Sequence, residues 1–360
     1  MKRPKRNDLK PSMTKVRGIP ATWDVSPIVS VVDLAGWLGV SEKRLLWLAA
    51  VDDHSSCGGN HYVCKWIRKR LGFRLIESPK LELKRVQRQI LHELLNAIPP
   101  SKWCHGFVRN RSVQTYVEEH CGKAVCLKMD LKNFFPSIRA GRIFGVLKRV
   151  GYPMAVCRVL TGLCTTSTAS DSLARLRELS GYGQGLHHLY GQRHLPQGAP
   201  TSPTLANMCA YRLDCRLAGL AERLGGQFSR YADDLLFSFD QAAFDKRQAR
   251  NWIRRLVTRI GSIAMEEGFE VNFRKTRAMF RAQKQLAAGV VLNQFPNLAR
   301  SEFDRIKAIL HNCVVHGPES QNKDNHNDFR SHLAGKIAWI RQLNSQRADK
   351  LDGMFAKINW

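Results

Sequence analysis

Apolar and polar residues follow two different spacings along the chain, and together they predict a mixed α+β protein. Apolar positions recur every three or four residues in segments 32–38, 41–50 and 80–98, which indicates amphipathic helices. Segment 61–78 instead reads as two strands joined by a basic turn that contains Gly72. The sequence has no internal repeat, which excludes a repeat array.

The second half of the chain changes between the same two spacings. Residues 123–135 predict a strand that ends in a carboxylate, and residues 201–221 predict one short helix. Strands are expected on both sides of "YADD", followed by a helix over 245–267. Further strands are expected through "FEVNFRKTRAMF" and "AAGVVLN".

The tail after about residue 300 predicts one more helix. Ser301 and Asp304 resemble a capping box at its start. Four apolar residues at helical spacing would form its buried stripe: Phe303, Ile306, Ile309 and Leu310.

The charge of the chain points to a polyanionic partner. It contains 57 Lys and Arg against 30 Asp and Glu, a formal net charge of +27. Nucleic acid is the usual partner of such an excess, because each neutralised phosphate releases counterions. An intrinsically basic protein and a membrane-surface binder are the alternatives.

Membrane spans and secretion signals are not expected. No run reaches the roughly 20 apolar residues that a spanning helix needs, and the basic start continues into polar sequence. These features favour a cytoplasmic protein without a membrane partner. The 10 Cys lie scattered in a sizeable chain, which favours reduced core thiols over a disulfide framework.

One local cluster has the spacing of a metal site. His54, Cys57, His61 and Cys64 could together hold zinc. The segment "NHYVCKWI" also alternates as a strand should, so the same residues fit a purely structural interpretation.

Two adjacent aspartates in "FSRYADDLLFSF" carry the clearest chemical signal. Asp233 and Asp234 interrupt two strand-forming apolar runs, although charged residues are unfavourable there. If this hairpin pairs with the strand that ends at Asp130, three carboxylates converge, and such hard oxygen ligands suit Mg²⁺. An Asp-Asp pair that simply marks a turn is the alternative.

Four motifs that follow one another along the chain, two of which contain these aspartates, carry a family resemblance. "DLKNFFPSI", "LPQGAPTSPTLAN", "YADDLLFSF" and "VNFRKT" follow one another, and this set resembles the reverse transcriptase family over about residues 61–313. Together with "HGFVRNRSV" and the helix "RIKAILHNC", it is most similar to bacterial retron enzymes and their relatives in phage defence. Group II intron enzymes and those of diversity-generating elements fit less well.

The resemblance implies a metal site. Asp130 and Asp233 would be the principal ligands, with Asp234 completing the carboxylate set and the Leu131 carbonyl contributing. Two Mg²⁺ ions, with Mn²⁺ as an alternative, would support nucleotidyl transfer.

The resemblance also implies nucleotide-binding residues. Phe135 would be the sugar gate that favours dNTPs, and Gln197 and Gly198 would lie under the incoming nucleotide. Arg74 would grip the triphosphate, and Lys275 would protonate departing pyrophosphate as a general acid. Ordinary core packing is the alternative for Phe135, and a solvated strand end is the alternative for Lys275.

The implied fold is a right-hand polymerase, an α+β protein with fingers, an antiparallel-sheet palm and a helical thumb. Residues 1–50 would form a basic arm and helices, and 51–125 the fingers. The palm would cover 126–297, including a fingers-side segment and insert at about 151–195, and the thumb 298–360.

The implied function is RNA-directed DNA synthesis. A dedicated structured noncoding RNA would serve as template and primer, dNTPs as substrates, and an RNA–DNA hybrid as product, in antiphage defence beside an effector protein. A related defence enzyme that makes repetitive, untemplated or protein-primed DNA is one alternative, and a catalytically inactive RNA-binding relative is another.

Three departures bear on which RNA is recognised. Retron enzymes commonly carry Asn-Ala-x-x-His where this chain has "YVEEH" and keeps only His120. They commonly carry Val-Thr-Gly where it has Ala287-Ala288-Gly289. The Ser-, Gly- and His-rich insert over 165–194 is a further candidate for a lineage-specific contact.

Overall fold

A computed structural model describes the chain except residues 1–27, 51–60, 70–71, 169–172, 174–183 and 241–245. The chain divides into two compact units. Unit 1 comprises Met1–Ser101, Lys132–Arg212 and Glu266–Phe269. Unit 2 comprises Lys102–Leu131, Leu213–Met265 and Glu270–Trp360.

The described part of unit 1 starts with two short helices, α1 (Val31–Leu38) and α2 (Glu42–Ala49). Ser41 is the N-cap of α2, because its hydroxyl accepts from the Arg44 amide at 3.3 Å. The predicted hairpin is present, with β1 (Tyr62–Lys69) antiparallel to β2 (Gly72–Pro79). The expectation that Gly72 lies in the turn is wrong, because Gly72 is the first residue of β2 and pairs with Lys69.

Helices complete unit 1. The predicted helix after Pro79 is α3 (Leu81–Glu93), which is followed by the 3₁₀ turn η1 (Leu95–Ala97). Helices α5, α6 and α8 follow, with bounds Ala140–Val150, Met154–Cys164 and Gln184–Gly191. Helix α6 packs on α2, where a Cβ added to Gly162 would lie 2.3 Å from the Ala49 carbonyl oxygen. Only glycine permits this approach.

The expectation of one short helix over 201–221 is wrong, because two helices form there. Helix α9 covers Ser202–Cys209, and the longer α10 covers Tyr211–Arg223. They are separated at Ala210, whose φ of −86° and ψ of 0° lie in the bridge region rather than the helical one.

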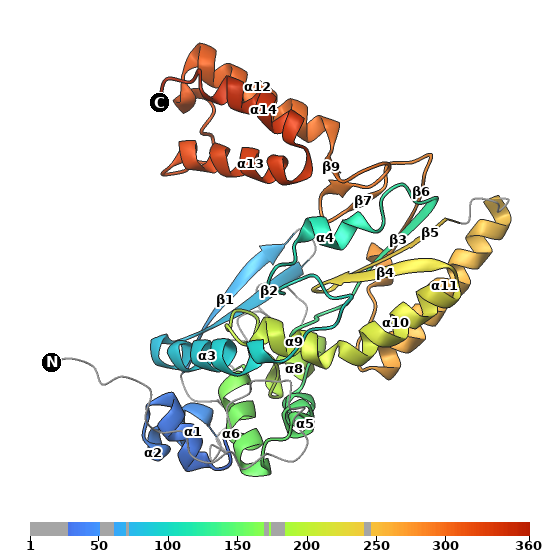
Figure 1. Cartoon of the computed structure of the whole chain (residues 1–360). Helices are drawn as coiled ribbons and strands as arrows, with labels where there is room; N and C mark the ends of the chain where they lie inside the picture. Colours follow the sequence, from blue (N-terminus) through green and yellow to red (C-terminus); the bar gives the residue numbers. More distant parts are fainter. Residues whose placement is uncertain (1–27, 51–60, 70–71, 169–172, 174–183, 241–245) are drawn as a thin grey trace. The chain divides into compact units, whose positions relative to one another are not determined.

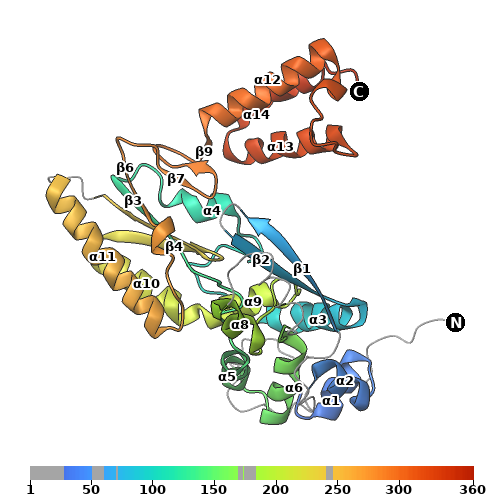
Figure 2. The same cartoon turned by 180° about the vertical axis from the view of Figure 1, so that it is seen from behind.

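A four-stranded antiparallel sheet is the centre of unit 2 (Figures 1 and 2). Its strands are β3 (Val125–Asp130), β4 (Gly226–Tyr231), β5 (Asp234–Phe239) and β6 (Arg277–Phe280), in the order β4-β5-β3-β6. Both views show α10 and α11 (Lys246–Glu266) along one face. Helix α4 (Val113–Glu118) packs on the other face, where Tyr116 and Val117 join Leu236 in a buried cluster.

The chain between α11 and the last helices is less regular than predicted. Residues expected to continue a strand before β6 form the 3₁₀ turn η2 (Phe273–Lys275). A small sheet follows, made of β7 (Leu286–Ala287), β8 (Val290–Val291) and β9 (Asn297–Leu298). Ala288 and Gly289 have φ values of 47° and 83°, so they form a tight two-residue turn of the kind that twisted hairpins favour.

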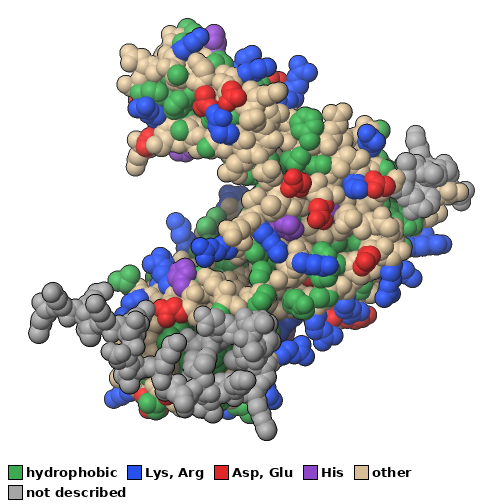
Figure 3. Space-filling view, viewed as in Figure 1, with side chains coloured by type: hydrophobic (Ala, Val, Ile, Leu, Met, Phe, Trp, Pro, Cys, Tyr) green, Lys and Arg blue, Asp and Glu red, His purple; other side chains and the backbone are tan. Residues whose placement is uncertain are grey.

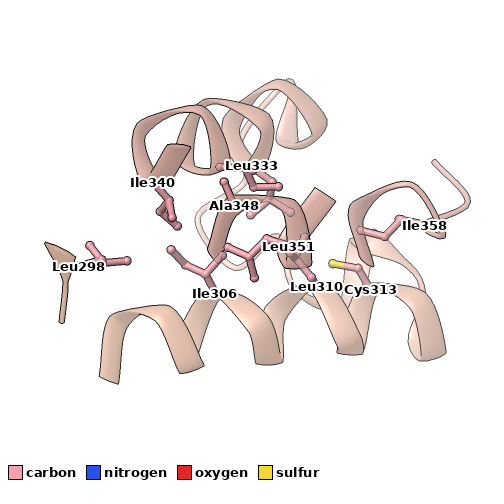
Figure 4. Close-up of a cluster of buried hydrophobic side chains, with 10 residues drawn as sticks. Leu298, Ile306, Leu310, Cys313, Leu333, Ile340, Ala348, Leu351 and Ile358 are labelled. Carbon is pink, nitrogen blue, oxygen red and sulfur yellow. The ribbon is translucent and has the colours of Figure 1, made fainter. Parts of the chain in front are cut away.

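Three helices end unit 2 and share a core of their own (Figure 4). They are α12 (Arg300–His316), α13 (Phe329–Leu343) and α14 (Ser345–Phe355), with the 3₁₀ turn η3 (Pro318–Ser320) between the first two. The predicted apolar stripe of α12 faces this core. The predicted capping box is wrong, because the helix already starts at Arg300 and its N-cap, Ala299, makes no side-chain bond.

Lys and Arg side chains are distributed over the face of both units that Figure 3 shows. Within the described part of the chain, every helix is too short or too polar to span a bilayer.

We expect Leu310→Ala to lower the free energy of unfolding of the α12–α14 core. Leu310 is fully buried, and its truncation would cost about 2.5–5 kcal/mol through lost burial and a residual cavity. Val315→Ala is the control, because Val315 lies on the same helix and is 57% exposed. Urea unfolding with hydrogen exchange of α12–α14 measures the effect, and equal stability of the two variants would contradict this packing.

Candidate active site

The register of the central sheet brings the predicted carboxylates together. Asp130 at the end of β3 pairs with Asp234 at the start of β5. Asp233 occupies the two-residue turn between β4 and β5, and its carbonyl oxygen accepts from the Leu131 amide at 2.9 Å. Three acidic residues from two distant segments thus meet at one end of the sheet.

Two lysines neutralise part of this charge. Lys275 Nζ lies 3.0 Å from both carboxylate oxygens of Asp130. Lys128 Nζ lies 3.1 Å from Asp234 Oδ2. The structure therefore brings the predicted Lys275 to the carboxylates. It adds Lys128, which the sequence analysis missed although it stands two residues before Asp130 and so faces the same side of the sheet.

Electrostatics make the cluster unfavourable without a further cation. Burial raises the pKa of the Asp233 carboxyl, and the neighbouring Asp130 adds to this shift. Burial also raises the pKa of Asp234, although Lys128 opposes the shift. The raised pKa values mean that the surrounding groups do not fully stabilise the ionised carboxylates. A bound cation would supply the missing stabilisation.

A buried ion pair supports the turn that carries Asp233. Arg230 and Asp214 have side chains with no exposure, and the guanidinium donates to Asp214 Oδ1 and Oδ2 at 2.6 and 2.8 Å. Arg230 Nη1 also donates to the Ala232 carbonyl at 3.0 Å. Burial disfavours the charged guanidinium, but Asp214 outweighs that effect and raises the pKa of Arg230. The pair therefore fixes the turn to α10.

The segment around residues 103–106 supports the backbone of the turn. Ala232 adopts a φ of 55°, an unusual value for a residue with a Cβ. The Arg230 amide donates to the Trp103 carbonyl, and the Arg230 carbonyl accepts from the His105 amide, each at 2.8 Å. A Cβ on Gly106 would lie 2.5 Å from the Ala232 nitrogen, so glycine is required for this segment to lie against the turn.

His120 connects strands β4 and β5 through hydrogen bonds to one serine of each. Ser229 donates to the Tyr116 carbonyl at 2.8 Å, so its oxygen accepts from His120 Nε2 at 2.7 Å. His120 Nδ1 then accepts from the Ser238 hydroxyl at 2.7 Å. Burial lowers the pKa of His120 to about 3, which agrees with a neutral ring. Because it is fully buried, His120 acts inside unit 2 and presents no surface to RNA.

In unit 1, Gln197 and Gly198 lie against β2. The Glu77 amide donates to the Gln197 carbonyl at 2.9 Å. Gly198 has a φ of 136°, and a Cβ there would approach the Glu77 carbonyl oxygen to 2.9 Å, so the loop requires glycine. The buried Glu77 carboxylate lies 2.8 Å from both His194 Nε2 and Thr168 Oγ1, which ties the loop to the strand.

The other two predicted nucleotide residues also belong to unit 1. Arg74 is half-buried on β2, opposite Ile67 of β1. Phe135 is half-buried beside the buried Phe134, whose ring stacks on Phe269 at 5.6 Å between centroids. Phe134 is therefore the residue that packs in the core, and part of the Phe135 side chain remains accessible to solvent.

The residues present fit a divalent cation at the carboxylates, because three hard oxygen donors gather there and burial raises the pKa of two of them, Asp233 and Asp234. Among the described residues, no group of three or more His, Cys, Asp or Glu is already arranged to hold a metal ion. Lysines engage two of the three carboxylates, Asp130 and Asp234. The zinc hypothesis gains no support. His61 Nε2 lies 3.1 Å from the Trp47 carbonyl, and His54 and Cys57 fall outside the described residues.

Comparison with known proteins identifies the family of this fold and site. Residues 67–305 match the model of the family described as reverse transcriptase (RNA-dependent DNA polymerase). The match covers more than half of the chain, so the chain belongs to the reverse transcriptase family. The expected polymerase fold is thereby confirmed.

Curated relatives narrow the group to the retron enzymes. The chain is 41% identical to the retron Mx65 reverse transcriptase of Myxococcus xanthus over 81% of its length, and 37% identical to the retron Mx162 enzyme over 78%. It is 28% identical to the retron Ec86 reverse transcriptase of Escherichia coli over 79%. The matches cover 63%, 58% and 76% of those relatives. The predicted resemblance to bacterial retron-type enzymes is confirmed, although the chain spans less than two thirds of both Myxococcus relatives.

We expect Arg230→Leu to destabilise unit 2 strongly. It leaves Asp214 buried without its cation, and breaking such a pair costs about 3–5 kcal/mol. The double variant Arg230→Leu/Asp214→Leu removes both charges and should recover most of the loss in urea unfolding. A single variant with wild-type stability, or a double variant as unstable as the single one, would contradict this role of the ion pair.

Proposed function

We propose that the chain is an RNA-directed DNA polymerase of retron type. The observation that supports this most directly is the pairing of Asp130 with Asp234 beside Asp233, with Lys275 on Asp130. Membership of the reverse transcriptase family gives these residues a chemical role, and the retron relatives indicate the subtype.

In this proposal Asp130, Asp233 and Asp234 hold divalent metal, with Mg²⁺ the expected ion, Mn²⁺ the alternative and two ions the expected number. Bound metal would supply charge stabilisation for the attacking hydroxyl and the departing pyrophosphate. The Leu131 carbonyl contributes a further oxygen. Register and turn geometry hold the carboxylates together before substrate arrives, so metal and substrate bind without a further rearrangement of these residues.

The other predicted site residues would bind the incoming nucleotide or transfer a proton to pyrophosphate. Lys275 carries the proton that pyrophosphate takes up on leaving, and its 53% exposed side chain allows it to exchange that proton with solvent. In unit 1, Arg74 grips the triphosphate and the loop of Gln197 and Gly198 lies under the incoming nucleotide. The accessible part of Phe135 excludes a ribose 2′-hydroxyl.

We assign fingers to 51–125, palm to 126–297 and a helical thumb to 298–360. The partners in this proposal are a structured noncoding RNA as template and primer, dNTPs, an RNA–DNA hybrid product and an effector protein. The biological role is antiphage defence. A related defence enzyme that makes repetitive, untemplated or protein-primed DNA is the second candidate, favoured by the altered "YVEEH" and "AAG" elements.

Asp233→Asn tests the proposal directly. On an RNA template with a DNA primer, dNTPs and Mg²⁺, we expect this variant to lose about 1,000-fold or more in extension rate, since it removes several kcal/mol of charge stabilisation. Asp240→Asn is the control, because it removes an equal charge from an exposed position just after β5. Extension by Asp233→Asn at the wild-type rate would refute the assigned site.

Nucleic acid that co-purifies with the protein and its native flanking locus separates the candidates. The retron proposal predicts one defined DNA joined to one structured RNA, absent from Asp233→Asn. Repetitive, untemplated or protein-linked DNA would move the chain to the second candidate.

A further inference from the structure

Helix α11 carries a basic outer face that the polymerase proposal does not use. Between Lys246 and Met265 the helix has six Lys or Arg residues and no Asp or Glu. Four of these are exposed, and within the described part of the chain none of the four side chains has an ion-pair partner: Arg250, Arg254, Arg255 and Arg259. Figure 3 shows blue side chains along the edge where Figure 1 draws α10 and α11.

The four arginines form two rows. At 3.6 residues per turn, Arg250 and Arg254 lie on one side of the exposed face, and Arg255 and Arg259 lie on the other. A strip of small polar residues separates the rows: Asn251, Thr258 and Ser262. From Arg250 to Arg259 the rows extend for about 14 Å along the axis.

This arrangement is unfavourable for the helix alone. Arg250 with Arg254, and Arg255 with Arg259, are like charges at the spacing that brings side chains together, and each pair destabilises a helix. An anionic partner outside the chain would offset this repulsion.

The opposite face of α11 is already covered. Four apolar residues of α11 are buried: Ala249, Leu256, Ile260 and Ala264. Trp252 meets Phe239 of β5 edge-on, with 4.8 Å between ring centroids. A helix that lies on a membrane needs a free apolar face, which α11 lacks, so the exposed rows favour a partner recognised by charge and polar contacts.

The rows lie on the far side of the sheet from the carboxylates. Phe239 faces α11, and because successive strand residues point to opposite faces, Asp234 and Ser238 of the same strand point away from it. A ligand on α11 therefore occupies a surface separate from the candidate active site.

We propose that the outer face of α11 binds the backbone of an A-form nucleic-acid duplex across its minor groove. The two arginine rows contact the phosphates of the two strands. The strip between them contacts 2′-hydroxyls, which the wide and shallow A-form minor groove displays. Thr258 and Ser262 donate their own protons to the Arg254 and Thr258 carbonyls, so their oxygens remain acceptors for a 2′-hydroxyl. The proposal does not depend on polymerase activity.

The test uses a blunt 24-base-pair RNA duplex and the DNA duplex of the same sequence, with fluorescence anisotropy of the full chain. Replacing the four arginines by glutamine should raise the dissociation constant for RNA about 10- to 100-fold and lower the slope of affinity against salt by about three to four. The matched control removes four exposed cations of unit 1 by the same change to glutamine: Arg85, Arg88, Lys148 and Arg149. It should alter the dissociation constant less than about threefold and leave the slope unchanged.

A second variant tests the strip alone. Asn251→Ala/Thr258→Ala/Ser262→Ala should reduce the preference for RNA over DNA while the salt slope stays as in the wild type. Equal losses in the two glutamine variants, or unchanged RNA binding by the α11 variant, would overturn the proposal. Equal affinity of the wild-type protein for the RNA and DNA duplexes would also overturn it. The same holds if the α11 variant loses binding to phosphatidylserine vesicles, the unit 1 variant keeps it, and RNA binding persists in both. Primer extension by the same proteins reports separately on the proposed polymerase function.

Discussion

Like charges at one end of the central sheet are the constraint on which the arrangement of unit 2 depends. The β3–β5 register leaves Asp130 opposite Asp234, and the turn adds Asp233. Carboxylates at such positions repel one another and lose hydration, as the raised pKa values of Asp233 and Asp234 show. Sheet pairing and apolar burial must therefore hold the carboxylates in place against this repulsion until a cation compensates it.

The surrounding residues follow from that constraint. Lys128 and Lys275 supply partial compensation within the chain. The Arg230–Asp214 pair and the His120 hydrogen bonds keep the strands from relaxing apart. Both supports are fully buried, so they act as internal framework. The exposed cations of α11 lie elsewhere, on the face of the sheet that does not carry the carboxylates, and there they are available to a ligand.

The sequence predicted the parts of this account that depend on local pattern. The helices at 32–38 and 41–50, the hairpin at 61–78 and the strands around "YADD" are where the spacing indicated, because each pattern is complete within its own segment. The break at Ala210 was missed, since one residue in the bridge region interrupts an otherwise continuous helical pattern. The start of α12 was misplaced because backbone geometry rather than the Ser301 side chain defines it.

Partners distant in the sequence could not be predicted in the same way. Nothing around Arg230 identifies Asp214 as its partner, although an arginine inside an apolar strand already indicates that a partner exists. The signal for Lys128 was its spacing from Asp130, but its bond to Asp234 depends on a register that only the folded sheet defines. Roles of Arg74, Phe135 and Gln197 rest on motif similarity and stay predictions.

Binding of Mn²⁺, followed by electron paramagnetic resonance, tests the central claim most directly. The account predicts saturable binding by the wild-type protein and its loss in Asp130→Asn/Asp233→Asn, with the fold retained. Equal binding by both proteins would show that the metal is held elsewhere and that the carboxylates are not its ligands.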